Sequence, residues 1–146
     1  MKTLVVALIA FAGAAHAQYR PATDLRPFAS HVALTWNTHP QVACPEFTAI
    51  AVTAVDGGDA MITLDDGATA PLRYDGYSVQ NMSDVGQILS NSYSIVGTKI
   101  HMSLEFNDDG SWPATRLEGF RALNVYTGVQ GRSGVYTSQI CSYKLL

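Results

Sequence analysis

Residues 100–106 alternate apolar and polar side chains with a period of two, and no other feature constrains the fold of this chain as strongly. Successive side chains of a β-strand point to opposite faces, so this pattern predicts a strand with one face in a core. The other face is expected to contact solvent or a partner. The apolar face consists of Ile100, Met102, Leu104 and Phe106, and the polar face of Lys99, His101, Ser103 and Glu105.

Comparable runs recur along the chain between short turn sequences. Asp56-Gly57-Gly58-Asp59 and Asp65-Asp66-Gly67 contain residues that tolerate positive φ, which is typical of hairpin turns. Pro71 indicates an edge strand, because proline cannot donate a ladder hydrogen bond. We predict seven strands, over residues 31–37, 47–55, 60–64, 69–74, 100–106, 120–126 and 135–145.

One segment predicts a helix. Ser83 is a good N-cap, Asp84 after it favours the helix dipole, and Gly97 is a good C-cap. Seven strands and one helix, without alternation between the two, indicate a mainly β domain, either a small β-barrel or an α+β fold. The residues expected on one stripe of this helix are Val85, Ile88, Leu89, Ser92 and Val96.

Residues 1–17 have the three parts of a secretory signal peptide: Lys2, the apolar run 4–15 and the box Ala15-His16-Ala17. The apolar run is too short to span a bilayer. We therefore expect cleavage after Ala17, a secreted or periplasmic location and no transmembrane segment. Residues 18–30 are interpreted as an N-terminal arm and residues 31–146 as a single domain.

The net charge limits the class of partner that the chain is expected to bind, and the cysteine content bears on the compartment. The net charge is −3, and the predicted cleavage makes it more negative because it removes Lys2. This sign argues against nucleic acid or an anionic membrane surface, because both favour clustered basic residues. Cys44 and Cys141 are the only cysteines. In an oxidising compartment they are expected to form a disulfide.

The sequence lacks the motifs of a catalytic or metal-binding protein. No pair of histidines has the spacing of zinc ligands, and no motif indicates a cofactor or a serine nucleophile. We therefore expect no metal, no cofactor and no enzymatic activity. Most carboxylates fall in predicted turns or on predicted outer faces, and Glu105 and Glu118 are the exceptions. Because two carboxylates can act together in glycoside hydrolysis, a small hydrolase is an alternative interpretation.

Aromatic residues give the remaining functional signal. Tyr77, Trp112 and Tyr126 lie in or near loop-rich regions, where flat rings stack on sugars or anchor a protein interface. Trp36, by contrast, alternates in step with Val32 and is expected in the core.

The order of elements from Phe47 onward, with Val96-Gly97 before the strand 100–106 and Gly110-Ser111-Trp112-Pro113 after it, resembles the secreted B subunits of subtilase- and pertussis-like bacterial toxins. The resemblance implies an OB-type barrel of about seven strands with one short helix, assembly into homo-oligomers and binding of cell-surface glycans. Phe47-Thr48-Ala49-Ile50 falls where that family has an aromatic-serine-glycine-aliphatic sequence. Thr48 would then take the place of the glycan-binding serine.

These observations favour a non-enzymatic, secreted or periplasmic binding domain built on an OB-like β-barrel. Its ligand is expected to be a glycan or a protein surface, contacted through Thr48, Tyr77, Trp112 and Tyr126. A periplasmic inhibitor or accessory protein that binds another protein is the second hypothesis. A small hydrolase is the third.

Overall fold

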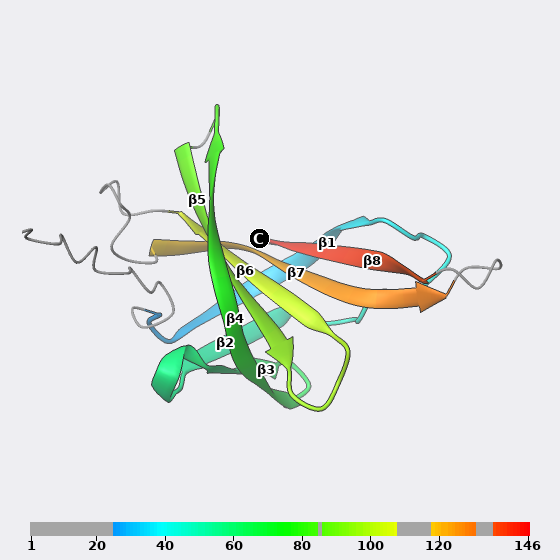
Figure 1. Ribbon diagram of the computed structural model, residues 1–146, viewed down its shortest axis with the longest axis horizontal. Coiled ribbons are helices and arrows are strands. Elements are labelled where there is room, and N and C mark those ends of the chain that lie inside the picture. Colours follow the sequence, from blue (N-terminus) through cyan, green and yellow to red (C-terminus); the bar gives the residue numbers. More distant parts are fainter. Residues whose placement is uncertain (1–24, 85, 108–117, 131–135) are drawn as a thin grey trace, which may run out of the picture.

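The computed structural model describes residues 25–84, 86–107, 118–130 and 136–146 of the chain, and these form one closed antiparallel β-barrel (Figure 1). Each strand pairs with its neighbours in sequence, and β8 pairs with β1 to close the ring. The prediction of a mainly β barrel is confirmed. The strands are β1 (Phe28–Asn37), β2 (Ala49–Ala54), β3 (Ala60–Leu64), β4 (Thr69–Met82), β5 (Gly86–Ile95), β6 (His101–Asn107), β7 (Glu118–Gln130) and β8 (Tyr136–Leu145), with a short 3₁₀ turn, η2 (Asp56–Gly58), between β2 and β3.

The strand order is an up-and-down meander of eight strands rather than the expected seven. An OB fold is a five-stranded Greek-key barrel, so the connectivity differs from the OB-type order that the resemblance implied. In a closed ring every strand has two partners, and no strand is an edge. The edge position expected for Pro71 is therefore wrong. Pro71 lies one residue before the β4–β5 ladder begins at Leu72, and its carbonyl oxygen accepts a hydrogen bond from Val96 N (3.2 Å).

The predicted helix is wrong, because the segment forms β5. Its inward side chains are Leu89, Asn91 and Tyr93, none of which has any exposed surface, and they alternate with outward serines. Serine and asparagine are poor helix formers, whereas β5 pairs along its length with β4 on one side and β6 on the other. Tertiary pairing therefore decided the structure of a segment whose local signals were ambiguous.

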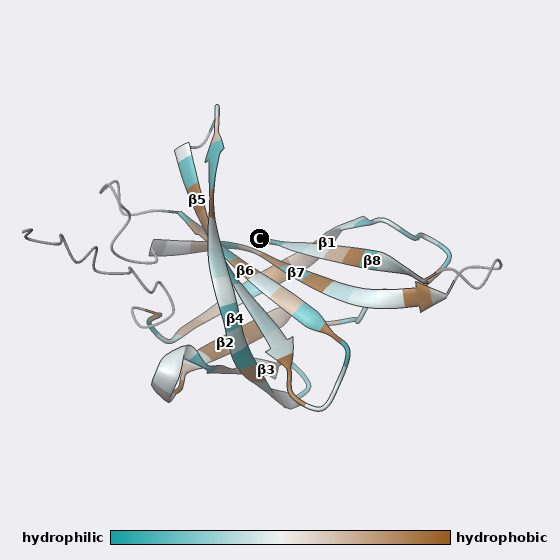
Figure 2. Cartoon of the chain, in the orientation of Figure 1, coloured by the Kyte–Doolittle hydropathy of each residue, from teal (hydrophilic) through white to brown (hydrophobic). Residues whose placement is uncertain are grey.

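Inward-facing aliphatic and aromatic side chains fill the barrel. They include Val32, Val52, Ile62, Leu104 and Leu123, each almost fully buried. Hydrophobic residues are prominent along β2, while β4 is mostly hydrophilic (Figure 2). The barrel is thus a packed core with a polar outer surface over β4.

The connection between β1 and β2 folds across one end of the barrel. The predicted disulfide is present: Cys44 in this connection is bonded to Cys141 in β8. Phe47 stacks on Tyr143 with 4.3 Å between ring centroids, and Tyr143 OH donates a hydrogen bond to Pro45 O (2.6 Å). These contacts fix the connection to the last strand.

The first strand differs from its prediction in two ways. It begins at Phe28, within the segment interpreted as an arm, and Leu25 before it is buried in the core. Trp36, expected in the core, has 58% of its surface exposed. The cause is a bulge: Leu34 pairs with Tyr143, but Trp36 pairs with Ser142, so one extra residue turns Trp36 to the outer face.

The predicted signal peptide, residues 1–17, lies outside the described residues. Within the described part of the chain, no helix has the length and apolar character needed to cross a membrane.

Candidate functional site

The outer face of strands β4 to β7 is hollowed into a groove of about 620 Å³ that is lined mainly by polar side chains. We call it the polar groove. Ser90, Ser94 and Ser103 point away from the barrel interior, yet each is less than 10% exposed. Outward-facing residues this deeply buried mean that the sheet is concave here. The polar lining residues are Arg73, Asp75, Ser78, Gln80, Ser90, Ser92, Ser94, His101, Ser103, Glu105 and Tyr126.

The sequence of β5 explains why the groove exists. Leu89, Asn91 and Tyr93 take the inward positions, which leaves Ser90, Ser92 and Ser94 for the outward ones. Serine side chains are short, whereas longer polar side chains stand at outward positions on both sides, among them Arg73 and Gln80 on β4 and His101 and Glu105 on β6. A row of short side chains between two rows of longer ones forms the floor of a groove.

A hydrogen-bond network centred on Asn124 of β7 organises the part of the groove over β6 and β7. Asn124 Nδ2 donates to Glu105 Oε1 (2.7 Å) and Ser103 Oγ (3.2 Å), and Asn124 Oδ1 accepts from Ser142 Oγ (2.6 Å). The hydroxyls of Ser103 and Tyr126 lie 3.3 Å apart. Asn124 is 9% exposed and engages one of the two carboxylate oxygens of Glu105. The network therefore fixes Glu105 and Tyr126 in place before any ligand arrives.

The adjoining part of the groove, over β4, β5 and β6, holds a cluster of charged and hydroxyl groups. Ser94 Oγ donates to Asp75 Oδ2, and Ser94 Oγ also lies 3.1 Å from His101 Nδ1. Arg73 Nε lies 3.7 Å from Asp75 Oδ1. Because the Ser94 proton is directed to Asp75, Ser94 accepts from a proton on His101 Nδ1.

This cluster does not have the arrangement of a hydrolytic triad. In a triad the histidine lies between serine and carboxylate, and its ring nitrogen accepts the serine proton. Here Ser94 lies between Asp75 and His101 and donates its hydrogen bond to the carboxylate. The hydroxyl therefore lacks the hydrogen bond to a histidine acceptor nitrogen that activates the serine of a triad.

The two carboxylates of the groove are far apart along the sheet. Asp75 bonds to Ser94, whereas Glu105 lies opposite Ser90. Four residues of strand correspond to roughly 13 Å. Glycosidases hold their two carboxyl groups about 5–9.5 Å apart. Glu118, the other candidate for hydrolysis, has a side chain outside the part that the structure describes.

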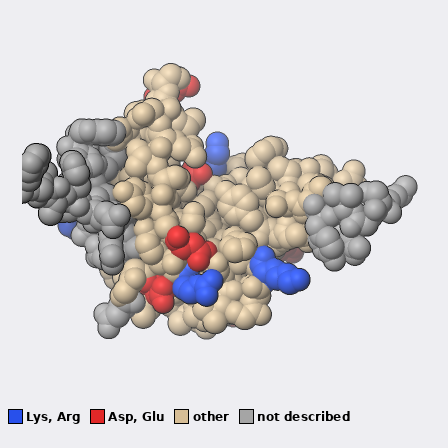
Figure 3. All heavy atoms as spheres, in the orientation of Figure 1, with Lys and Arg blue, Asp and Glu red and all other residues tan. Residues whose placement is uncertain are grey.

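Charge is sparse on this side of the molecule. In Figure 3 acidic and basic side chains lie beside one another over β4, and most of the face is uncharged. The described residues contain no group of three or more histidine, cysteine or acidic side chains that could hold a metal ion.

Among the binding residues predicted from sequence, Tyr126 lines the polar groove and two others lie elsewhere. Thr48 is exposed in the β1–β2 connection, where its backbone N and its Oγ1 both donate to Asp65 Oδ2 at 2.7 Å. Tyr77 is 45% exposed and pairs with Asn91, on the face of β4 opposite to the groove. Trp112 lies outside the described residues.

Sequence reasoning missed most of the groove. Asp75, His101 and Asn124 were not expected in a site, and neither were the serines of β5. The available signal was the period of two in residues 88–95, where serines follow one another at alternate positions. The helix interpretation of the same segment concealed it.

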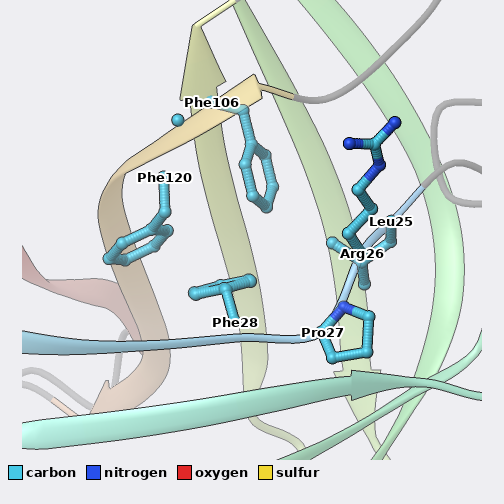
Figure 4. A pocket seen from close by; sticks show the side chains of 7 residues that line it. Leu25, Arg26, Pro27, Phe28, Phe106 and Phe120 are labelled. Carbon is cyan, nitrogen blue, oxygen red and sulfur yellow. The ribbon is translucent and has the colours of Figure 1, made fainter.

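A second hollow, of about 320 Å³, lies at the end of the barrel opposite the β1–β2 connection (Figure 4). Phe28 stacks on Phe120 at 4.9 Å and meets Phe106 edge-on at 5.7 Å. Arg26 extends beside the three rings. Since the rings pack mainly against one another, they close this end of the core, and we do not consider this hollow the principal site.

Comparison of the chain with family models, with curated proteins and with solved structures found no match.

Proposed function

We propose that the protein is an exported, non-enzymatic carbohydrate-binding module whose glycan ligand lies in the polar groove. The observation that carries this proposal is the network in which buried Asn124 holds Ser103 and Glu105, with Tyr126 beside them, on a concave surface of serine hydroxyls. Sugars present closely spaced hydroxyls that both donate and accept hydrogen bonds. A rigid array of hydroxyl, carboxylate and imidazole groups matches that chemistry at little ordering cost.

The character of the groove favours a sugar over a protein surface. Protein interfaces are anchored by large apolar or aromatic side chains that enter desolvated pockets. The groove instead presents short hydroxyls, and Tyr126 is its one outward aromatic ring among the described residues. A tyrosine ring offers a flat face for a sugar, and its hydroxyl offers a hydrogen bond.

Two features support binding without turnover. The Ser94 proton is directed to Asp75, and the strand positions beside Asp75 and Glu105, Ser94 and Ser90, are farther apart than the carboxyl groups of a glycosidase. Export is supported by the sequence of residues 1–17 and by the Cys44–Cys141 disulfide, which suits an oxidising compartment.

A glycan array followed by calorimetry tests the proposal on the purified full chain. Glu105→Gln keeps the oxygen that accepts from Asn124 but removes the charge, and Tyr126→Phe removes only the hydroxyl. A hydrogen bond to a charged group contributes about 1.5–3 kcal/mol, so Glu105→Gln should weaken binding of the strongest glycan about tenfold or more. A neutral hydrogen bond contributes about 0.5–1.5 kcal/mol, so Tyr126→Phe should weaken it about two- to tenfold.

Matched controls are Glu46→Gln and Tyr77→Phe, which change the same residue types outside the groove and should bind as the wild type does. The proposal fails if no glycan binds, or if the controls weaken binding as much as the groove variants. Release of free sugar during prolonged incubation would replace it with the hydrolase hypothesis.

A further inference from the structure

The end of the barrel that the β1–β2 connection crosses is not completely filled. An apolar pocket of about 200 Å³ opens there between Pro45 and Phe47 of the connection, the β3–β4 turn and the β5–β6 turn. The two turns lie together at the lower edge of Figure 1. We call this space the mouth pocket.

Its lining is almost entirely hydrocarbon. Eleven described residues line it, and Thr69 is the only polar one among them. The floor consists of Phe47, Ile62, Met102 and Val125, each less than 10% exposed. A water molecule held in a protein needs two to four polar partners. This lining offers almost none, so water is poorly held in the pocket and easily displaced.

Small side chains keep the pocket open. Ala68 and Ala70 occupy the positions where β4 begins, and Ala70 faces inward beside Ile62. A larger aliphatic residue at Ala70 would fill the space, as the neighbouring inward positions Leu64 and Leu72 do elsewhere in the barrel. The sequence thus leaves a defined apolar space in a core that is otherwise closely packed.

We infer that the mouth pocket binds a small, uncharged, apolar molecule of the size of a single substituted ring. Barrel mouths are common ligand sites, and a dry apolar cavity of about 150 Å³ is large enough for benzene. The pocket lies inside the barrel, whereas the polar groove lies on its outer face, so this inference is independent of glycan binding.

Titration of the full chain with toluene, followed by amide NMR shifts, tests the inference. Saturable shifts are expected at Ala68, Ala70, Ile100 and Met102. Ala70→Leu should weaken toluene binding at least tenfold because the added side chain occupies the space. Ala51→Leu is the matched control, a half-buried alanine on the outer face of β2, and should leave the titration unchanged.

Benzoate provides a second arm that needs no variant. It has nearly the size of toluene but carries a charge, so the apolar lining should exclude it at concentrations where toluene saturates. The inference is overturned if toluene gives no saturable shifts, if benzoate binds equally well, or if a folded Ala70→Leu variant binds toluene like the wild type.

Discussion

Thr48 holds the carboxylate of Asp65 through two hydrogen bonds, one from its backbone N and one from its hydroxyl. These bonds favour the charged carboxylate, and the side-chain bond is the larger cause that lowers the pKa of Asp65 below its ordinary value of 3.8. A carboxyl whose pKa is lowered by folding stabilises the native state above that ordinary value. The stabilisation is lost as the pH falls through the lowered pKa.

Thr48→Val should raise the pKa of Asp65 toward 3.8 without restoring it fully, since the backbone bond remains. NMR titration of the Asp65 carboxyl measures this directly. Thr53→Val, an exposed threonine of β2, is the control. An unchanged Asp65 titration in Thr48→Val would show that the hydroxyl contact does not form.

Tyr143 gives a prediction at alkaline pH. Burial raises its pKa from 10.0 to about 12, and burial raises the pKa of Tyr93 to about 12 as well. In the unfolded chain both tyrosines release their protons near the ordinary pKa of 10.0. The stabilisation that they contribute is therefore fully present below about pH 10, and it is lost as the pH rises toward 12. In Tyr143→Phe, the free energy of unfolding should fall less between about pH 8 and about pH 11 than in the wild type.

Urea denaturation at the two pH values measures that difference. Loss of the bond to Pro45 O should cost the variant roughly 1 kcal/mol at the lower pH. An identical pH dependence in both proteins would contradict the assignment of the alkaline effect to Tyr143.

Strand β5 shows how far the sequence determines this fold. The strand β3 was predicted at its observed bounds, residues 60–64. The strand predicted over residues 69–74 was too short, because β4 continues to Met82. Residues 83–97 instead matched a helix stripe and a strand alternation at once. Only the hydrogen-bonded pairing of this segment with β4 on one side and β6 on the other selects the strand over the helix. Local pattern alone lacks that information.

The same limit applies to the candidate site. Tyr126, predicted as a binding residue because it is an aromatic residue near a loop, lines the groove, whereas Asn124 and Asp75 contact groove residues on neighbouring strands. Their roles depend on register, and register in this barrel includes bulges near Trp36 and Gly76. A single inserted residue reverses the face of every residue that follows it, which no periodicity argument can locate in advance.

Two buried asparagines in neighbouring parts of the sheet should respond to the same substitution by different amounts. Asn91 is completely buried in the barrel, donates to Tyr93 OH (3.2 Å) and leaves its Oδ1 without a partner among the described residues. Asn124 satisfies both ends of its amide in the groove.

Asn91→Leu should change the free energy of unfolding by less than roughly 1 kcal/mol, because removal of the unsatisfied buried oxygen offsets loss of the hydrogen bond to Tyr93 OH. Asn124→Leu should lower it by roughly 1–3 kcal/mol, because Glu105 and Ser103 lose their partner. Urea denaturation of both variants measures these changes in the free energy of unfolding. Destabilisation of Asn91→Leu by as much as Asn124→Leu would mean that Asn91 is fully hydrogen-bonded in solution.

The whole barrel is tied by the Cys44–Cys141 disulfide, whose cysteines are 97 residues apart. A crosslink over so long a loop restricts the unfolded chain, which corresponds to about 4–5 kcal/mol in the chain-entropy description. The bond also anchors the connection that forms one wall of the mouth pocket.

A double variant with Cys44→Ala and Cys141→Ala should lose stability by up to about 4–5 kcal/mol in urea. Reductant should destabilise the wild type comparably and leave the double variant unaffected. Equal destabilisation of both proteins by reductant would show that the loss of stability does not arise from reduction of the disulfide.

Ring closure by β1 and β8 has a consequence for biosynthesis. Val32 pairs with Leu145, so the first strand acquires its second neighbour only after β8 has been made. Before that point no pairing can close the ring, because β1 and the strand made last each lack one neighbour. Contacts between residues so distant in sequence form slowly, and closure of the ring is therefore expected as a late step of folding.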